Sequence, residues 1–410
     1  MPTERLQSLL ETELAAIAAR GTAKRNESVV VRALPPSGDQ GPRVLLAGEG
    51  DKPFLKMNSN SYLGLSRRPE LLAAEEHAAR AFGAGPGAVR FISGTHQPHV
   101  DLERRLAEFH RREAGMIFSA AYATVLSVIL PLVTAETAIV SDELNHNCII
   151  NAIRLSRPKD KQVYKHLDLR GLEAELEKAA DSGARRCLVV TDGIFSMRGD
   201  HAPLAEIFAI ARRWDERFPE NVITVVDDSH GVGAFGKTGR GTEEATGSGP
   251  ADVLVATLGK ALGVNGGYVV GSRTLLTYFR ETSPMYIYSN PITPSEAAAA
   301  AAALAILDSA EGRRLLEHLR AMTSRFEQGL VRLGFETIPG EHPVVPLMVR
   351  DTARTQALVA HLRHSGILAT GLAYPVVPRG DEEIRFQINA DMTPHDVDFA
   401  LGVLERFAGR

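Results

Sequence analysis

Short apolar runs alternate with longer amphipathic stretches through the middle of the chain. The apolar runs predict strands at residues 115–118, 138–141, 187–191, 222–227, 253–256 and 268–270. Between them, residues 172–180 and 204–214 carry apolar side chains at helical spacing. Because strands that alternate with helices are typical of βαβ units, the pattern predicts an α/β fold. Its sheet should be mostly parallel and covered by helices on both faces.

The two ends of the chain follow other patterns. Near the start, an amphipathic helix is predicted by Leu6, Leu9, Leu10, Leu14 and Ile17, and a Pro/Gly-rich connector follows it. After Pro294, residues 295–307 predict a long helix with Ser295 as its N-cap. Further strands are expected near residues 344–349 and 384–388. We therefore predict an N-terminal helix and connector (1–59), a large α/β domain (60–294), and a connector helix with a smaller α+β domain (295–410).

Composition narrows the choice of partners and compartment. The chain has 46 basic and 50 acidic residues, and this balance does not indicate a nucleic-acid partner. Only Cys148 and Cys187 are present, so we expect no disulfide framework and a reducing compartment. The N-terminus lacks a signal-peptide apolar region, and the alanine-rich stretch 297–307 is too short to span a bilayer. We therefore expect a cytoplasmic protein without a membrane span.

Lys260 and Asp227 are the residues with the clearest chemical meaning. Lys260 follows the predicted strand 253–256 in a glycine turn, and Asp227 ends the strand 222–227. A lysine that is desolvated at the end of a buried strand has a lowered pKa, and its neutral amine is a nucleophile. An aspartate on a neighbouring strand can hold a pyridinium nitrogen protonated. Together the two residues indicate a pyridoxal 5'-phosphate (PLP) site, in which Lys260 forms the Schiff base.

The segment 231–238 matches two nucleotide-binding patterns. It reads Gly-Val-Gly-Ala-Phe-Gly-Lys-Thr, which fits both the phosphate-loop pattern and the dinucleotide G-x-G-x-x-G pattern. Both patterns need a helix immediately after the glycines, whereas Gly239 and Gly241 follow here and would break its first turn. We interpret the segment as an irregular loop, and keep nucleotide binding as a minor alternative.

Further residues are placed to complete a PLP site. Ser196 and His230 follow strands and are candidate donors to the phenolic oxygen of the ring, and His146 is a flat group that can cover one ring face. The phosphate would use the backbone N–H groups of Ala121 and Tyr122 at a helix start, with the Thr257 hydroxyl. Each of the hydroxyl residues also has an ordinary interpretation as a turn or cap residue. The histidines near residue 99 have no second cluster at metal-ligand spacing, so we expect no metal site.

Seven motifs in order give the chain a resemblance to a known family. They are Asn60–Leu65, Val89–Thr95 with His99, Ser141–His146, Thr191–Met197, Asp227–His230, Thr257–Ala261 and Ile384–Gln387. With these motifs the chain resembles the α-oxoamine synthases, PLP enzymes of the aspartate aminotransferase fold, over nearly its whole length. The resemblance implies a PLP-dependent transferase of fold type I. It also implies a Claisen condensation between a small amino acid and an acyl thioester of coenzyme A or a carrier protein.

The resemblance also assigns roles that the residues alone do not. It implies that Arg385, with Asn60, binds the carboxylate of the amino acid, and that His230 polarises the thioester carbonyl. It implies a homodimer with shared active sites, in which Ser289 and Asn290 reach the phosphate of the partner subunit. Val89 stands where a β-branched residue accompanies the use of glycine, and steric filling beside Cα is a reasonable cause.

Two departures from the family pattern leave the substrate open. Asn147 stands where alanine is usual, and Val264-Asn265 replaces small residues before Gly266. Members that use alanine or serine with a longer acyl thioester therefore remain an alternative. An aminotransferase of the same fold is a second alternative, and a nucleotide-binding module at residues 231–238 is a third.

Overall fold

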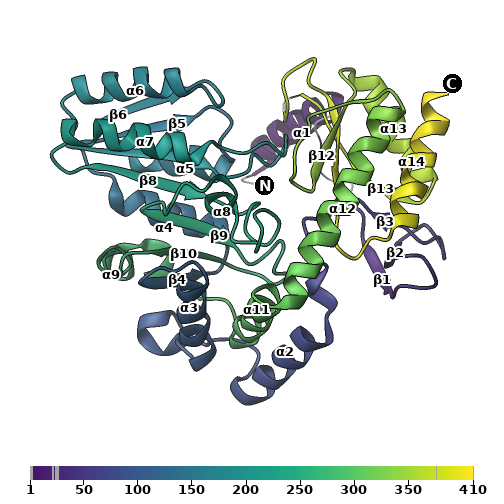
Figure 1. The fold of residues 1–410 in the computed structure, drawn as a ribbon, viewed down its shortest axis with the longest axis horizontal. Helices are drawn as coiled ribbons and strands as arrows, with labels where there is room; N and C mark the ends of the chain where they lie inside the picture. Colours follow the sequence, from purple (N-terminus) through teal and green to yellow (C-terminus); the bar gives the residue numbers. More distant parts are fainter. Residues whose placement is uncertain (1–2, 21–22, 24–26, 375, 410) are drawn as a thin grey trace.

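The computed structural model describes residues 3–20, 23, 27–374 and 376–409. Its largest sheet has seven strands and lies in the lobe at the left of Figure 1. The strands lie in the order β4-β10-β9-β8-β7-β5-β6. Their bounds are β4 (Ala114–Phe118), β5 (Thr137–Asp142), β6 (Asp160–Tyr164), β7 (Arg186–Asp192), β8 (Val222–Asp227), β9 (Val253–Thr257) and β10 (Gly267–Gly271). All strands are parallel except β10, which runs antiparallel to both of its neighbours.

Successive side chains of each strand point to opposite faces of the sheet, and most of them are apolar. They therefore contribute to two hydrophobic layers, one on each face. Leu188 and Val190 of β7 pack in one cluster, and Val189 packs in the other. The first layer is completed by α4 (Ala121–Leu132), α5 (Asn147–Ser156), α9 (Arg273–Thr282) and α10 (Pro284–Ile287). The second is completed by α2 (Pro69–Phe82), α3 (Gln97–Phe109), α6 (Leu169–Asp181), α7 (Leu204–Trp214) and α11 (Pro294–Leu307). Because both faces are covered, the strands are continuous apolar runs.

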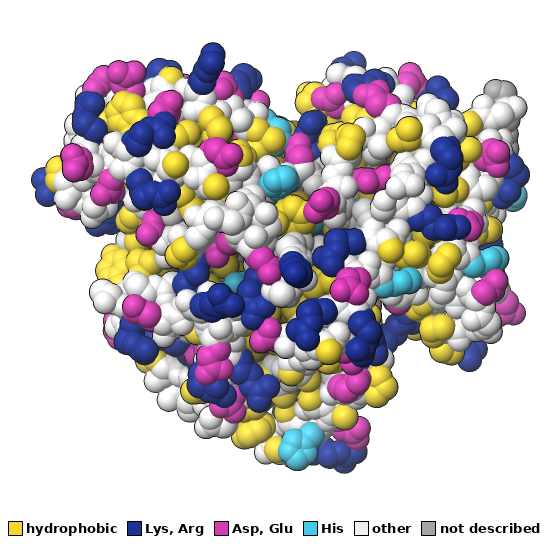
Figure 2. Space-filling view, in the orientation of Figure 1, with side chains coloured by type: hydrophobic (Ala, Val, Ile, Leu, Met, Phe, Trp, Pro, Cys, Tyr) yellow, Lys and Arg dark blue, Asp and Glu magenta, His cyan; other side chains and the backbone are white. Residues whose placement is uncertain are grey.

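The C-terminal region forms a second lobe, and the notch between the lobes is visible in Figure 2. Its antiparallel sheet has the order β11-β12-β15-β14. The bounds are β11 (Glu336–Thr337), β12 (Val344–Met348), β14 (Thr370–Leu372) and β15 (Glu383–Gln387), with helices α12 (Ala310–Arg332), α13 (Thr352–His364) and α14 (Pro394–Ala408). N-terminal strands join this lobe: β3 (Leu55–Lys56) pairs with β13 (Ile367–Leu368), and β2 (Arg43–Leu46) pairs with β1 (Val30–Leu34). The division into three parts stays a prediction.

The predicted strands and helices are present, and three of the differences from the prediction have a clear physical reason. Strand β6 was not predicted, because its alternating exposed residues at the sheet edge give no apolar run. The reversal of β10 was not predicted either, since periodicity carries no strand direction. The N-cap of α11 is Thr293 and not Ser295: the Thr293 hydroxyl accepts from the Glu296 N–H at 3.0 Å, and the Glu296 carboxylate accepts from the Thr293 N–H at 2.7 Å. A capping box therefore begins this helix two residues earlier than expected.

The predicted N-terminal helix is present as α1 (Glu4–Ala19), and none of its side chains is buried. Within the described ranges, no helix combines the length and hydrophobicity needed to cross a bilayer.

Candidate active site

A small pocket lies at the carboxyl ends of the parallel strands, where the switch-point rule places ligands in α/β folds. It is lined by Ala121, Tyr122, His146, Cys148, Asp192, Ile194, Ser196, Asp227, Ser229, His230 and Lys260. Seven of the predicted cofactor residues therefore meet in one place. Ile194, Ser229, Cys148 and Asp192 were not assigned a role from the sequence. A strand-end carboxylate in register with Asp227 was the available signal for Asp192.

Lys260 stands on a closed turn after β9. The turn is fastened by hydrogen bonds from the Leu258 N–H to the Gly266 carbonyl at 2.9 Å and from the Gly263 N–H to the Lys260 carbonyl at 3.0 Å. Burial lowers the pKa of Lys260, although the carboxylates of Asp227 and Asp192 act in the opposite direction. A larger share of the amine is therefore neutral than for an exposed lysine, as a nucleophile or base requires.

Asp227 and Asp192 end adjacent strands and are paired in register. Asp227 accepts hydrogen bonds from the N–H of Ser229 at 3.1 Å and from its hydroxyl. Asp192 is buried, and burial together with the nearby charge of Asp227 raises the pKa of its carboxyl well above the ordinary value. Two carboxylates in a dry site repel each other, so this pair favours a positively charged group between or beside them. A protonated pyridine nitrogen fits that requirement.

The start of α4 supplies an anion site. Its N-cap, Ala120, has no side-chain hydrogen bond, and within the described residues the N–H groups of Ala121 and Tyr122 have no acceptor. Such groups, together with the helix dipole, favour a phosphate. A Cβ on Gly267 would lie 2.4 Å from the Ala121 nitrogen, so only glycine allows β10 to pass this close. The Thr257 hydroxyl donates to the Gly266 carbonyl at 3.1 Å and accepts from the Gly259 N–H at 3.0 Å.

Two histidines of the pocket are held in defined orientations. His146 is the N-cap of α5, and its Nδ1 accepts from the Cys148 N–H at 3.2 Å. Burial lowers its pKa, so the neutral ring carries its proton on Nε2. His230 Nδ1 lies 2.7 Å from the Tyr62 hydroxyl, and burial lowers the pKa of His230 well below its usual value. The predicted ring-facing role of His146 and its ordinary role as a helix cap are therefore compatible.

Arg385 of β15 and Asn60 lie together near the Ser196 turn. Arg385 donates to the Asn60 side-chain oxygen at 3.4 Å through its terminal nitrogen, and to the Ser196 carbonyl through Nε. Gln387 donates to the same Asn60 oxygen at 2.8 Å. Among the described residues no carboxylate forms an ion pair with Arg385, although burial lowers its pKa. A buried guanidinium without such a partner is suited to bind the carboxylate of a ligand.

Besides Asn60, Thr257 and Arg385, three further predicted site residues lie outside the lining of the pocket. Val89 precedes a single π-helical turn, η2 (Arg90–Gly94), in which Phe91 and Ile92 are 65% and 68% exposed. Ser289 and Asn290 follow Tyr288, which is 81% exposed. The structure of one chain therefore does not bring these residues to the Lys260 pocket.

The glycine segment after β8 is a compact irregular loop. Gly233 and Gly236 have positive φ values of 78° and 80°, and the next helix, α8 (Thr242–Thr246), begins only at Thr242. The Asp228 carboxylate accepts from the Thr242 N–H and hydroxyl at 2.7 Å each, which fastens the loop from inside. The helix that both nucleotide-binding patterns require directly after the glycines is therefore not formed there, which argues against the nucleotide-binding alternative.

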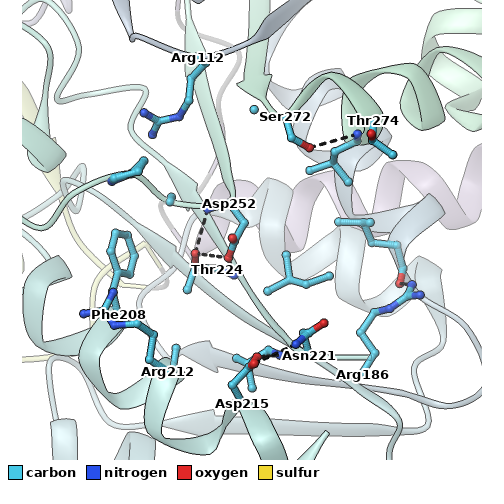
Figure 3. A pocket seen from close by; sticks show the side chains of 18 of the residues that line it. Arg112, Arg186, Phe208, Arg212, Asp215, Asn221, Thr224, Asp252, Ser272 and Thr274 are labelled. Carbon is cyan, nitrogen blue, oxygen red and sulfur yellow. Dashed lines mark hydrogen bonds between the residues drawn. The ribbon is translucent and has the colours of Figure 1, made fainter. Parts of the chain in front are cut away.

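A larger pocket lies at the amino ends of the parallel strands, opposite the Lys260 pocket, and contains none of the predicted site residues (Figure 3). Its arginines are matched by carboxylates, and several are already paired: Arg112 contacts Glu243 at 2.7 Å and Arg186 contacts Glu220 at 2.8 Å. No three His, Cys, Asp or Glu side chains in the described part of the chain converge as a metal site.

Comparisons with known proteins agree with this geometry. The family model for aminotransferase class I and II matches residues 52–404. The chain is 39% identical to 8-amino-7-oxononanoate synthase of Thermosipho melanesiensis, over 87% of this chain and 88% of the relative. It is 37% identical to the mitochondrial 2-amino-3-ketobutyrate coenzyme A ligase of Bos taurus, over 96% and 90%.

Solved structures give the same result. Serine palmitoyltransferase of Sphingomonas wittichii superposes with a TM-score of 0.88 at 26% identity, and covers 99% of this chain and 98% of that one. The fold is that of the PLP-dependent transferases of type I. The chain belongs to the aminotransferase class I and II family and, within it, to the PLP-dependent α-oxoamine synthases.

Proposed function

We propose that this α-oxoamine synthase condenses glycine with a short acyl-CoA, as glycine C-acetyltransferases do. The family activity is the condensation of a small amino acid with an acyl thioester. The observation that supports its assignment to this pocket is that Lys260 and Asp227 line one pocket with the start of α4, and that the guanidinium of Arg385 is close enough to Lys260 to lower its pKa. The product would be a 2-amino-3-oxoacid, or an α-amino ketone after loss of the carboxylate, with release of CoA.

The predicted cofactor residues of this chain each have a proposed task. PLP, when bound, supplies an electron sink for negative charge that develops on the amino-acid α-carbon. Asp227 keeps the ring nitrogen protonated, His146 covers one ring face, and Ser196 and His230 donate toward the phenolic oxygen. Ala121 and Tyr122 bind the phosphate through their N–H groups, with Thr257 turning its hydroxyl toward it. The fit rests on the open N–H groups and on the paired carboxylates.

Lys260 and Arg385 act on the amino acid. The lowered pKa of Lys260 increases the share of neutral amine that can remove the α-proton. Arg385 and Asn60 hold the carboxylate, so the amino acid has one orientation relative to that amine. His230, or a donor beside it, polarises the thioester carbonyl.

Similarity alone leaves the substrate undecided. The 8-amino-7-oxononanoate synthase and the 2-amino-3-ketobutyrate coenzyme A ligase are nearly equally similar to this chain, at 39% and 37% identity. A member that uses alanine or serine with a longer acyl-CoA or carrier-protein thioester is therefore the second candidate. Release of CoA from a series of acyl-CoA chain lengths, with each amino acid, separates the two. A half-transamination assay with keto acids tests for the aminotransferase alternative.

Val89 predicts which amino acid is used. If its methyl groups fill the space beside Cα, the enzyme should exchange the α-proton of glycine much faster than those of alanine and serine. One or two methyl groups in a pocket change affinity by about 1–3 kcal/mol, so the preference should be roughly 10- to 200-fold. Val89→Ser should reduce this preference. Deuterium exchange of each amino acid with enzyme and PLP is the measurement, and faster exchange of alanine or serine by the wild type would remove Val89 from this role.

A homodimer is the second prediction of this proposal. Large apolar side chains are exposed in α1, in η2 and at the end of α10, including Leu9 at 55%, Ile92 at 68% and Tyr288 at 81%. A second copy of the chain would cover such surfaces, and would bring Ser289 and Asn290 to the phosphate of its partner. We expect a dimer at micromolar concentration, and a several-fold weaker affinity for PLP in Ser289→Ala. Sedimentation analysis of the active enzyme tests this, and a fully active monomer would contradict it.

The compartment is also proposed and not observed. The use of two cysteines without a disulfide favours the cytoplasm. The bovine relative, in contrast, carries a mitochondrial designation in its name.

A further inference from the structure

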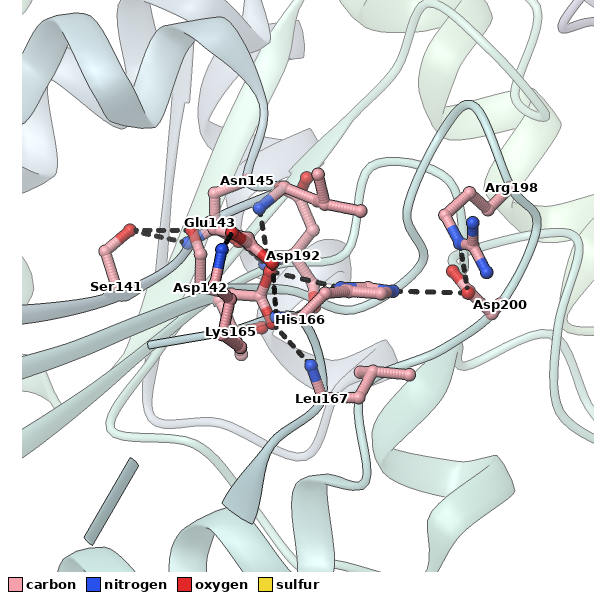
Figure 4. A network of polar contacts seen from close by, with 12 residues as sticks. Ser141, Asp142, Glu143, Asn145, Lys165, His166, Leu167, Asp192, Arg198 and Asp200 are labelled. Atoms are coloured by element: carbon pink, nitrogen blue, oxygen red, sulfur yellow. Dashed lines mark hydrogen bonds and ion pairs between the residues drawn. The ribbon is translucent and has the colours of Figure 1, made fainter. Parts of the chain in front are cut away.

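His166 lies outside the pocket and between two carboxylates that come from different segments (Figure 4). Its Nδ1 lies 3.1 Å from an oxygen of Asp142, at the end of β5, and its Nε2 lies 3.2 Å from an oxygen of Asp200, in the turn after β7. The side chain of Asp142 is 1% exposed, and that of His166 is 13% exposed. The contact is therefore a largely buried bridge and not a surface ion pair.

Each carboxylate also accepts hydrogen bonds from groups of the loop or turn beside it. Asp142 accepts from the Leu144 N–H at 2.8 Å and from the Leu167 N–H at 3.0 Å. Asp200 accepts from Arg198 Nε at 2.8 Å, and its backbone carbonyl accepts from the Phe195 N–H at 3.0 Å. Asp142 thus shapes the loop 142–146, and Asp200 shapes the turn 195–200.

Both segments lead directly to residues of the PLP pocket. In the loop, the Asn145 oxygen accepts from the Asp192 N–H at 2.8 Å, and the His146 N–H donates to the Asp192 carboxylate at 2.9 Å. In the turn, the Ser196 carbonyl accepts from Arg385. The His166 ring also packs edge-on against Phe195, with centroids 4.3 Å apart. His166 therefore links the backbone before His146 to the turn that presents Ser196.

The bridge requires a charged imidazole. A neutral imidazole has one N–H and can donate to one carboxylate, whereas both ring nitrogens of His166 face carboxylate oxygens. Burial alone would lower the pKa of His166, but the hydrogen bonds to Asp142 and Asp200 outweigh it and raise the pKa to about 9. The other charged neighbours are Glu143, which accepts from the His166 N–H and pairs with Lys165, and Arg198 on Asp200.

We propose that His166, as an imidazolium, is a positioning residue for the active site, which sets the spacing between the loop that ends in His146 and the turn that carries Ser196. The inference rests on the proposed roles of His146 and Ser196 beside the cofactor. His166 does not line the pocket, so it acts on the cofactor through these two segments and not by contact. Because its folded pKa is raised, its stabilising contribution is complete below about pH 6.5 and is lost as the pH rises through about 9.

The test compares the PLP dissociation constants of the full-length wild type and His166→Gln at pH 7, 8, 9 and 10. PLP is first removed from each protein, and its rebinding is then followed by absorbance titration. The ratio of the two dissociation constants cancels pH effects that both proteins share. We expect a ratio of roughly 10 at pH 7, as for the loss of one hydrogen bond between charged groups, that falls toward 1 at pH 10. Lys165→Gln, which breaks the neighbouring exposed pair with Glu143, should give a ratio of 1 throughout.

Asp200→Asn provides a second variant if His166→Gln does not fold, and should show the same fall of the ratio with pH. A ratio that stays constant with pH, or equals 1 at every pH, would overturn the positioning role. Absence of saturable PLP binding by the wild type would instead contradict the proposed cofactor site. The two failures are therefore distinguishable.

Discussion

Lys260→Ala should fold normally and lose all measurable turnover. The substitution removes the amine that we propose attaches the cofactor and accepts the α-proton, and no other lysine among the described residues lines the pocket. Wild-type protein with PLP should show a visible absorbance band that borohydride reduction abolishes, and the variant should show no band sensitive to borohydride. Circular dichroism and a thermal melt check the fold of the variant.

Lys237→Ala is the matched control for this experiment. Lys237 is the exposed lysine of the glycine loop, where the phosphate-loop pattern would place its essential lysine. Its removal should leave turnover and the visible band unchanged. If Lys237→Ala abolished activity while Lys260→Ala retained it, the active site would lie at the glycine loop and not at the strand ends.

Asp227→Asn should keep part of its cofactor but lose most of its activity. An amide cannot hold the ring nitrogen protonated, and truncation of a buried charged hydrogen-bond partner costs about 2–5 kcal/mol. That range corresponds to a roughly 30- to 5,000-fold fall in turnover. Steady-state CoA release, measured at saturating PLP, gives the size of the loss, and an unchanged rate would remove Asp227 from this role.

Asp228→Asn is the matched control for Asp227→Asn, because it makes the same change of carboxylate to amide at the next position. Asp228 is fully buried, and its carboxylate binds the N–H and hydroxyl of Thr242, away from the pocket. Asp228→Asn should lower the melting temperature, because a buried acceptor is lost, and should leave the visible band and the proton exchange of the folded enzyme intact. A change from carboxylate to amide would then affect catalysis at one position and stability at the next.

The sequence was sufficient to predict most of the pocket, because parallel strands bring their carboxyl ends to one edge of the sheet. Asp227 and Lys260 each follow a recognisable apolar run, and their convergence needs no knowledge of side-chain contacts. The same reasoning predicted Ser196, which follows β7, as a residue of the pocket. Residues at strand ends are predictable wherever strand order and direction are regular.

Other features depend on contacts that periodicity does not record. His166 follows β6, an edge strand whose alternating polar residues resemble a loop, so neither the strand nor the bridge to Asp200 was expected. Asp192 lies within the motif Thr191–Met197 but was given no role, because its hydrogen bond with the His146 N–H joins residues far apart in the chain. Ser295 was predicted as the cap of α11, whereas the reciprocal hydrogen bonds with Glu296 identify Thr293 as the cap.

The place of β4 at the sheet edge has a consequence for the order in which the newly made chain folds. Its backbone partners all lie in β10, where Ala114 pairs with Gly271, whereas β5, β7, β8 and β9 pair with strands that are close in the chain. During synthesis, β4 must remain an unpaired apolar strand until residue 271 has emerged, and such non-local pairing forms slowly. The start of α4, directly after β4, therefore joins the Lys260 turn only in the last stage of sheet assembly. If PLP binds the completed sheet and not its precursors, the PLP concentration helps to determine how much of the newly made chain stays folded.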